Sequence, residues 1–482
     1  MMARLLLVAP VFWATAGIAQ GGEVPFPNST ANIPISARDR FYTADQFSNT
    51  VSVIDPSTNQ LLGVIRLGDT MPRNLSPLYR GQLLVHGMGF SPDRKTLVVV
   101  SVGSNAVTFI DTATNRVKHT TYVGRAPHEA FFTPDGREVW VTVRGEDYVA
   151  VLDARSFVEI DRIKVPNGPG MTIFSPDGKY GYVCSSFTPE TVIIATRSRT
   201  IVGRVRQESP FCPNIAATPD GKQVWLTLKD SGRVMAFEAC PPFRVLKTIA
   251  TGAITNHVNF ARTAEGQHAY VTVGTENVVK VFNTSDFEQI ATIPVGSLPH
   301  GLWPSGDGSR IYVGLENDDS VAVVDTRSNQ VIASVPIGQG PQGVAYVPSA
   351  VPTGDGRANL SPLATASQKG ELTLSGQGRT QVTLFDQGQL QILQAAVAGL
   401  TPKTDYVLAL TSTADGAGVI EPLASFTTNI AGAAIVIAAG PLRRIGTGVG
   451  PNVRRHLVIR SIPPDTANAN VQLQDADPVS QR

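Results

Sequence analysis

Four of the seven histidines occupy matching positions in a repeated sequence pattern, and their side chains are the strongest candidates for chemistry. His86, His128 and His300 lie in VHGMGF, APHEAFF and LPHGLW, and His257, in TNHVNF, falls within one residue of the same position. A neutral imidazole can bind a metal ion or a haem iron, act as a base, or donate a hydrogen bond. If the repeats form a ring, these side chains converge on one axis and create a candidate ligand site.

Further polar residues are expected at the same end of the ring. Gln342 and Asn214 occupy the corresponding positions of two other repeats, and Arg144 and Arg73 fall in loops expected on that face. The predicted ligand-binding residues are therefore His86, His128, His257, His300, Gln342, Asn214, Arg144 and Arg73. A transition metal or a haem is the candidate cofactor, and the candidate metal ligands are His86, His128, His257, His300, Glu146 and Glu316.

A simpler interpretation gives these histidines no cofactor. A histidine in the channel of a ring can bond a backbone carbonyl of the next repeat or face solvent. The chain contains no P-loop, no GxSxG, no HExxH and no GxGxxG after a strand, so no catalytic residue can be assigned.

The elements that position the histidines belong to a repeat of roughly 42 residues. A turn of the form FSPDG or TPDG recurs, and its acidic residues lie 42 to 45 positions apart, at Asp93, Asp135, Asp177, Asp220, Glu265 and Asp307. Proline presets φ in such a turn, and Asp and Gly tolerate its tight geometry. Alternating segments such as VWVTV and AVTFID follow, giving four short strands in each repeat. This pattern predicts an all-β protein with a seven-bladed β-propeller over residues 39–347.

The ring is expected to close by combining its two ends in one blade. The first unit, Phe41 to Gly68, lacks a leading strand, and Pro341 to Tyr346 supplies a strand in that register. Such closure leaves no unpaired sheet edge between the ends.

Several segments of this repeat resemble the YVTN-type (YncE-like) β-propeller family. They are FYTADQFSNTVSVID, LVVVSVGSNAVTFID, AYVTVGTENVVKVF and IYVGLENDDSVAVVD. The resemblance implies the propeller fold and leaves activity open, because the family includes binding proteins, lactonase-like enzymes and cofactor-carrying domains.

A second all-β domain is expected after the propeller. Residues 348–357 are rich in Pro, Gly and Ala and are predicted to form a linker. Alternating segments then resume without the repeat over residues 358–461, and the segment GLTPKTDYVLAL resembles the tyrosine corner of a fibronectin-III-like β-sandwich. The polar residues 462–482 are predicted to be a disordered tail.

A long insertion between Gly68 and His86 is expected over the channel mouth. It carries Met71, Arg73, Tyr79 and Arg80. Such a loop suits a lid, a partner-binding surface or a helical cap on the blade edge.

The N-terminal residues indicate export. Residues 1–19 contain Arg4, an apolar run from Leu5 to Trp13 and the small residues Gly17 and Ala19, which is typical of a cleaved signal peptide. An uncleaved N-terminal anchor is the alternative. The three cysteines, Cys184, Cys212 and Cys240, permit one disulfide at most, and the sequence does not select the pair.

Two functions follow from these observations. The first is a periplasmic or secreted binding or scaffold protein that recognises a small molecule or a protein partner on its channel face. The second is a metal- or cofactor-dependent enzyme, either a lactonase-like hydrolase or a redox or haem-related propeller. The formal net charge of +1 gives no global field for binding nucleic acid, and no later segment has the length of a transmembrane helix.

Overall fold

The computed structural model describes residues 33–68, 81–263, 265–363, 369–386, 391–440, 442–445, 454–462 and 470–475. The described residues form β-strands, with two short 3-10 segments, η2 (Gly274–Glu276) and η3 (Leu442–Ile445). The predicted all-β class is confirmed. Within these residues there is no helix with the length and apolar character needed to cross a membrane.

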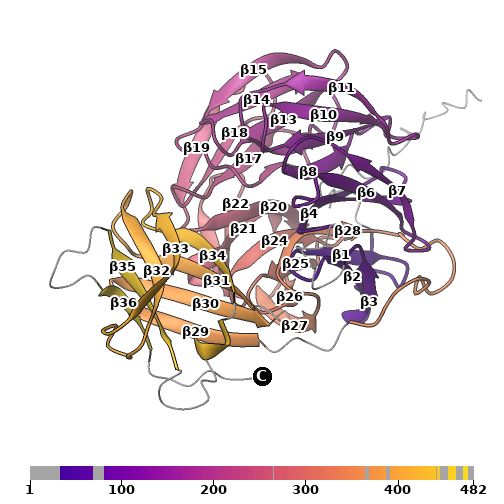
Figure 1. Ribbon diagram of the computed structural model, residues 1–482. Helices are drawn as coiled ribbons and strands as arrows, with labels where there is room; N and C mark the ends of the chain where they lie inside the picture. The colour runs from indigo at the N-terminus through magenta and orange to yellow at the C-terminus, as the bar shows by residue number, and fades with distance from the viewer. Residues whose placement is uncertain are drawn as a thin grey trace, which may run out of the picture.

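Seven four-stranded sheets form the blades of the predicted propeller (Figure 1). Blade 1 contains β28 (Pro341–Val347), β1 (Arg40–Asp45), β2 (Thr50–Asp55) and β3 (Gln60–Arg66). Blade 2 contains β4 (Val85–Phe90), β5 (Thr96–Ser101), β6 (Ala106–Asp111) and β7 (Val117–Tyr122). Blade 3 contains β8 (Pro127–Phe132), β9 (Glu138–Val143), β10 (Tyr148–Asp153) and β11 (Glu159–Lys164).

The remaining four blades follow in chain order. Blade 4 contains β12 (Pro169–Phe174), β13 (Tyr180–Ser185), β14 (Glu190–Ala195) and β15 (Thr200–Arg206). Blade 5 contains β16 (Ile215–Ala217), β17 (Gln223–Leu228), β18 (Arg233–Glu238) and β19 (Val245–Ala250). Blade 6 contains β20 (Thr255–Thr263), β21 (Gly266–Val273), β22 (Val278–Asn283) and β23 (Gln289–Pro294). Blade 7 contains β24 (Pro299–Pro304), β25 (Arg310–Leu315), β26 (Ser320–Asp325) and β27 (Gln330–Pro336).

The recurring turn forms as its sequence predicts. In blade 3 the Thr133 hydroxyl donates to the Asp135 carboxylate over 2.7 Å, and Gly136 adopts a φ of +68° that favours glycine. The same hydroxyl-to-aspartate bond occurs at Ser175 and Asp177 in the next blade. These local bonds fix the connection between the first two strands of a blade and thereby set where each first strand ends.

Blade 1 closes the ring with strands from both ends of the propeller segment. β28 pairs with β1 in antiparallel register, and Figure 1 shows the two side by side. The Tyr346 hydroxyl donates to Asp39 over 2.6 Å, and Asp39 also accepts the backbone N–H of Ser349 over 2.8 Å. The predicted closure of the ring is confirmed.

The innermost strands contain an irregularity at a recurrent position. The register of β4, β8 and β24 against their neighbouring strands shifts between Val85 and Met88, between Pro127 and Ala130, and between Pro299 and Leu302. A bulge disturbs the regular alternation of faces. Consecutive side chains at these positions therefore need not point to opposite sides of the blade.

The C-terminal strands form one sheet of eight strands. Their order is β33 (Ile420–Thr427), β32 (Asp405–Thr411), β35 (His456–Ser461), β36 (Asn470–Gln474), β29 (Lys369–Gly376), β30 (Gly378–Asp386), β31 (Gln391–Ala398) and β34 (Ala434–Gly440). The second all-β domain was predicted correctly. Its strands form a continuous, barrel-like sheet that nearly closes, where the sequence suggested the two layers of a sandwich. The predicted tyrosine corner forms, because the Thr401 N–H donates to the Tyr406 hydroxyl over 3.3 Å.

Two segments outside the predicted domains belong to the folded protein. β36 lies within residues 462–482, and it pairs with β29 and β35, so the prediction of an entirely disordered tail is wrong at this strand. Residues 348–357, predicted as a linker, lie against the propeller. Val351 bonds the Arg38 carbonyl, and Arg40 and Asn115 donate to the carbonyls of Asp355 and Gly356.

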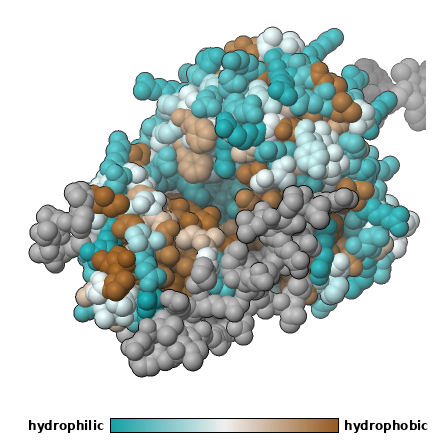
Figure 2. All heavy atoms as spheres, in the orientation of Figure 1, coloured by the Kyte–Doolittle hydropathy of each residue, from teal (hydrophilic) through white to brown (hydrophobic). Residues whose placement is uncertain are grey.

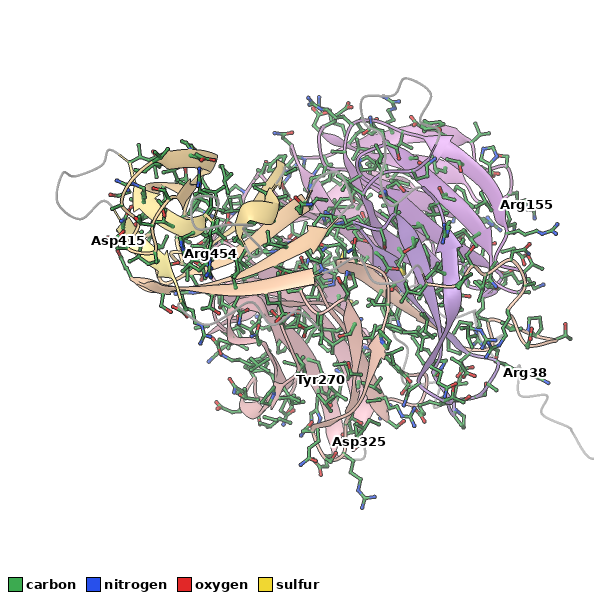
Figure 3. All side chains as sticks on the ribbon, turned by 60° about the horizontal axis from the view of Figure 1, so that its bottom comes forward. Arg38, Arg155, Tyr270, Asp325, Asp415 and Arg454 are labelled. Atoms are coloured by element: carbon green, nitrogen blue, oxygen red, sulfur yellow. A yellow bond between two sulfur atoms is a disulfide. The ribbon has the colours of Figure 1, made fainter. Side chains whose placement is uncertain are left out.

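The C-terminal domain packs against one end of the propeller. Ile254 and Leu298 share a buried apolar cluster with Ala396 and Ala433, and Phe47 contacts Phe385 with ring centroids 5.0 Å apart. In Figure 3, where Asp415 and Arg454 mark the C-terminal domain, this domain lies beside the propeller and away from Arg155. One face of the propeller is therefore partly covered by the second domain.

Candidate functional site

The four predicted histidines are all buried at the start of innermost strands, and their rings lie close together. His86 belongs to β4, His128 to β8, His257 to β20 and His300 to β24. The ring centroids of His86 and His128 are 4.4 Å apart, and those of His257 and His300 are 4.6 Å apart. A distance of 6.3 Å between the His86 and His300 centroids joins the two pairs. The predicted convergence on one axis is present in the structure.

Backbone carbonyl groups orient two of these rings. His128 places its Nδ1 atom 2.7 Å from the Gly170 carbonyl oxygen, and His300 places its Nδ1 atom 3.2 Å from the Gln342 carbonyl oxygen. In both cases the acceptor lies in the next blade, 42 residues further along the chain. A carbonyl can only accept, so each Nδ1 atom carries the proton. The Nε2 atom of each neutral ring then presents a lone pair.

Asn214 selects the opposite tautomer for His257. The side-chain oxygen of Asn214 accepts the Val258 N–H over 2.9 Å, so its amide nitrogen is the group that lies 3.3 Å from His257 Nδ1. That nitrogen donates, and His257 Nδ1 accepts. The proton of neutral His257 is therefore on Nε2. Asn214 positions a channel histidine, while the predicted ligand-binding role of Asn214 itself stays a prediction.

Burial keeps the channel histidines neutral. Desolvation, with smaller contributions from Arg144 and the neighbouring rings, lowers the pKa of His86 and His128 well below the usual range. Burial also lowers the pKa of His257, and it lowers the pKa of His300 to about 3. Neutral imidazoles are available as metal ligands and as hydrogen-bonding groups.

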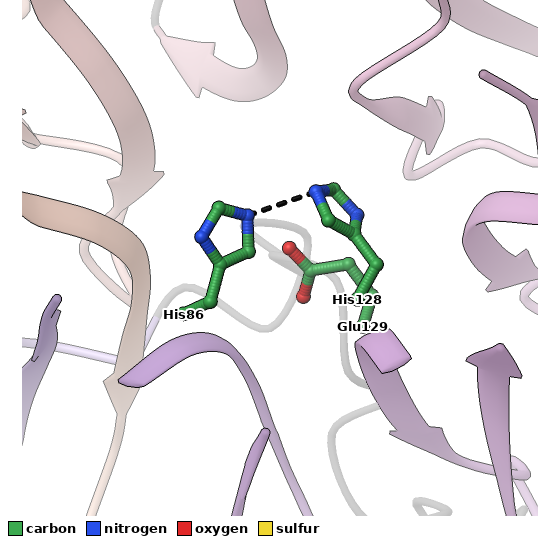
Figure 4. A group of neighbouring side chains, drawn as sticks. All are labelled: His86, His128 and Glu129. Carbon is green, nitrogen blue, oxygen red and sulfur yellow. Dashed lines mark hydrogen bonds between the residues drawn. The ribbon is translucent and has the colours of Figure 1, made fainter. Parts of the chain in front are cut away.

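The carboxylate closest to the histidine pair is Glu129, which sequence reasoning missed. One ligand atom each from His86, His128 and Glu129 lie within 4.8 Å of one another. The register shift in β8 lets adjacent residues His128 and Glu129 approach the same space, as Figure 4 shows. The available signal was the dipeptide His-Glu at a histidine position, but simple strand alternation placed the two side chains on opposite faces.

The two predicted acidic ligands have different surroundings. Glu146 accepts the Arg125 N–H over 2.9 Å at a loop and does not belong to the described cluster of ligand atoms around His86. Glu316 is buried 3.9 Å from His300 Nε2 and accepts a bond from the C-terminal domain, where Gln394 Nε2 lies 2.6 Å away. Burial raises the pKa of Glu316. Arg73 and the rest of the long insertion, residues 69–80, lie outside the described residues.

A cavity of about 450 Å³ lies between the channel mouth and the C-terminal domain. On the propeller side its lining includes Gln46, His86, Arg144, Lys229, Glu316 and Gln342. On the other side the lining includes Gln394, Asn429, Ala433, Ala434, Ile435 and Ile437. Figure 2 shows the surface hollowed between the two domains, with hydrophilic atoms in the hollow and hydrophobic atoms on its C-terminal side. The site is therefore built jointly by both domains.

Asp45, a carboxylate near the channel face, is fully buried within blade 1. Its carboxylate accepts hydroxyl bonds from Thr43, Thr50 and Ser52 at 2.6, 2.9 and 2.6 Å. Burial dominates over these bonds and raises the pKa of Asp45 to about 7. This residue is a structural group of the blade rather than part of the cavity lining.

The buried Asp45 makes a measurable contribution to the pH dependence of stability. The folded protein holds this proton up to about pH 7, whereas an unfolded chain releases it near pH 4, so the contribution is present at low pH and is lost as the pH rises between these values. In the unmodified protein this effect lowers the free energy of unfolding by about 2 kcal/mol as the pH rises from 5 to 7. We expect Asp45→Asn to abolish that decrease, because the variant has no carboxyl group to titrate. Urea unfolding of both proteins at the two pH values measures this difference. Equal pH dependence in the two proteins would contradict the assignment.

Comparisons with known proteins agree with this architecture. A sequence profile described as YNCE-like beta-propeller matches residues 28–351. No curated protein matches the chain. Among solved structures, hydrazine synthase of Kuenenia stuttgartiensis is similar with a TM-score of 0.52 and 18% identity, covering 64% of this chain and 98% of that chain. A functionally unknown protein from Desulfotomaculum acetoxidans has a TM-score of 0.53 and 15% identity over 64% of this chain and 98% of its own.

A third solved structure, the dihydro-heme d1 dehydrogenase NirN in complex with DHE, has a TM-score of 0.49 and 11% identity and covers 87% of this chain and 80% of that chain. At these identities the first two likenesses concern the fold alone. The sequence profile spans most of the chain and coincides with the seven blades. The chain therefore belongs to the YNCE-like β-propeller family.

Proposed function

We propose that this chain is an exported binding protein that takes a small molecule with an acidic group in the cavity between the propeller and the C-terminal domain. The observation that carries this proposal is the pair of cations, Arg144 and Lys229, in the lining of that cavity. Neither side chain forms an ion pair within 4 Å with any described residue. A ligand carboxylate or similar anion would supply the missing partner.

The charge state of the cavity supports an anionic ligand. Burial lowers the pKa of Arg144 only to about 10, so its guanidinium stays charged at neutral pH. Burial raises the pKa of Glu316 and Asp230, which favours the uncharged forms of these two carboxyl groups. Burial also lowers the pKa of Lys229, and Glu316 and Asp230 oppose part of that effect. Arg144 is therefore the firmly charged cation of the cavity, and an anionic ligand would pair with it.

The shape and polarity of the cavity describe the rest of the ligand. Its volume of about 450 Å³ is in the range of small-molecule sites. Gln46, Gln342 and Asn429 offer amide groups, while Ile435 and Ile437 offer apolar contact on the opposite side. This arrangement suits a compact molecule with its acidic end at the propeller and a hydrocarbon part against the C-terminal domain.

Export is supported by the N-terminal sequence and by the disulfide. Residues 1–19 have the order of charge, apolar run and small residues found in signal peptides. Cys184 and Cys212 are joined, and structural disulfides persist in oxidising compartments. Cell fractionation should recover protein that begins near Gln20 outside the cytoplasm; full-length protein confined to the cytoplasm would contradict this part of the proposal.

Calorimetric titration of the full chain with a panel of small mono- and dicarboxylates tests the binding site. We expect Arg144→Gln and Lys229→Gln each to weaken binding of the best carboxylate by roughly 10- to 100-fold. A charged hydrogen bond contributes about 1.5–3 kcal/mol, and each 1.4 kcal/mol changes the dissociation constant tenfold. The same ligand should raise the thermal midpoint of the unmodified protein and leave that of the weakened variants nearly unchanged.

Arg155→Gln provides the matched control, because Arg155 is an exposed arginine on the propeller that Figure 3 places away from the C-terminal domain. Its affinity should equal that of the unmodified protein. The proposal fails if no member of the panel binds, or if all three variants bind equally well.

A further inference from the structure

Two lone pairs face each other in the channel. His86 Nε2 and His128 Nε2 are 2.8 Å apart, and both rings are buried. The proton of His128 is fixed on Nδ1 by the Gly170 carbonyl, so His128 Nε2 can only accept. A contact this short between nitrogen atoms needs a proton or a cation between them.

His86 has the same orientation as His128. Its Nδ1 atom lies 2.9 Å from the side-chain oxygen of Gln46, an acceptor that places the His86 proton on Nδ1. With this arrangement neither Nε2 atom carries a proton. A histidine that ligates a metal through one nitrogen commonly donates its other N–H to a carbonyl or carboxylate, and both rings show this supporting bond.

A carboxylate lies beside the two nitrogens. Glu129 is buried, and one of its oxygens lies within 4.8 Å of a ligand nitrogen of each histidine, as seen in Figure 4. Burial raises the pKa of this carboxyl group, and the nearby backbone N–H of Met88 opposes part of that rise. Gly87 makes the approach possible, because a Cβ atom there would overlap the His128 carbonyl oxygen and the Glu129 carboxylate.

We propose that His86 Nε2, His128 Nε2 and the Glu129 carboxylate bind one divalent first-row transition-metal ion of the class that prefers imidazole, such as Zn²⁺ or Co²⁺. Two nitrogens and one oxygen form a ligand set that such ions accept. At bond lengths of about 2.0–2.1 Å a tetrahedral ion separates two nitrogens by roughly 3.3 Å. The imidazoles therefore need to move apart by about half an ångström.

The surroundings leave this ion open to the cavity. His86 belongs to the proposed ligand set and also lines the cavity that contains Arg144 and Lys229. Three protein ligands leave a fourth position for water or for an acidic group of a ligand. The metal site does not depend on the anion site, because all three proposed ligands come from β4 and β8 and none is a cation of the cavity.

Metal titration of chelator-treated full-length protein tests the inference. Calorimetry with Zn²⁺ and visible absorption with Co²⁺ should give one equivalent per chain, with Co²⁺ bands of a mixed nitrogen and oxygen environment. His128→Gln and Glu129→Gln should weaken binding by more than the roughly 10- to 100-fold that loss of a supporting hydrogen bond typically costs. Near-ultraviolet circular dichroism of each variant establishes that the fold persists, and His86→Gln replaces any variant that does not fold.

An exposed histidine provides the control. His119→Gln changes a histidine on β7, outside the channel, and this variant should bind one equivalent with unchanged affinity. The inference is overturned if the unmodified protein takes up no ion, which is the result expected when the Gln46 amide is turned and His86 donates a proton to His128. It is also overturned if the ligand variants bind as tightly as the control.

Discussion

Replacing Tyr346 by alanine is expected to lower the free energy of unfolding by at least 3–5 kcal/mol, a typical cost of removing a large buried aromatic side chain. Tyr346 lies on β28, the strand that closes the ring, and its side chain is fully buried. Its ring lies 5.7 Å from that of Tyr312 in blade 7, and its hydroxyl bonds Asp39 at the start of blade 1. One side chain therefore joins the last blade to the first.

Chemical unfolding of the full chain measures this effect, and Tyr346→Phe separates its parts. The phenylalanine variant retains the ring and removes one donor from the buried Asp39, so a smaller loss of about 1–3 kcal/mol is expected. Tyr122→Ala, at an exposed tyrosine of β7, is the control and should change stability by less than about 0.5 kcal/mol. A Tyr346→Ala protein as stable as this control would show that the closure contributes little.

The propeller could be predicted because the same pattern of strands and turns recurs along the sequence. Blades 2 to 7 each carry a version of the same turn sequence, as at Thr133 and Asp135 in blade 3, and the turn fixes the register of the following strands. A missing strand at one end of the repeat and an extra strand at the other then identify β28 and β1 as partners. No comparable redundancy exists in the C-terminal domain.

The C-terminal domain shows where strand patterns lose their predictive power. Alternation predicts a strand but does not say which strand it pairs with, and the order β36-β29-β30 brings together segments about 100 residues apart. β36 was missed because Asn470–Gln474 is short and polar, with one fully buried side chain. β36 pairs with β29 on one side and with β35 on the other, so these neighbouring strands decide its position.

The repeat predicted where the candidate site lies, but it did not predict all of the residues that form it. Equivalent repeat positions bring His86 and His128 together, with their Nε2 atoms 2.8 Å apart. Glu129 was missed because the register shift in β8 is a property of backbone geometry that the side-chain pattern does not reveal. The position of Arg144 on the channel face was predicted from the repeat. The residues on the opposite side of its cavity, such as Gln394 and Ile437, belong to the C-terminal domain, which the repeat does not describe.

The disulfide between Cys184 and Cys212 also resolves a question that the sequence left open. Cys184 lies on β13 of blade 4, and Cys212 precedes β16, the three-residue inner strand of blade 5. Cys240 is a free, exposed cysteine. The bond thus ties the shortest inner strand of the ring to its neighbouring blade, and Cys212 N–H also donates to the Ser185 carbonyl over 3.0 Å.

Reduction of this bond is expected to lower the free energy of unfolding by about 3–4 kcal/mol, the loop-closure entropy for a separation of 28 residues. Urea unfolding with and without dithiothreitol measures the change, and the double variant Cys184→Ala with Cys212→Ala should reproduce it in the absence of reductant. Cys240→Ser serves as the control and should retain the full response to dithiothreitol. Identical unfolding midpoints for the oxidised and reduced protein would mean that blade 5 is held by its strand pairing and apolar packing alone. The result also bears on export, because a domain that depends on this bond reaches its full stability only where the two thiols are oxidised.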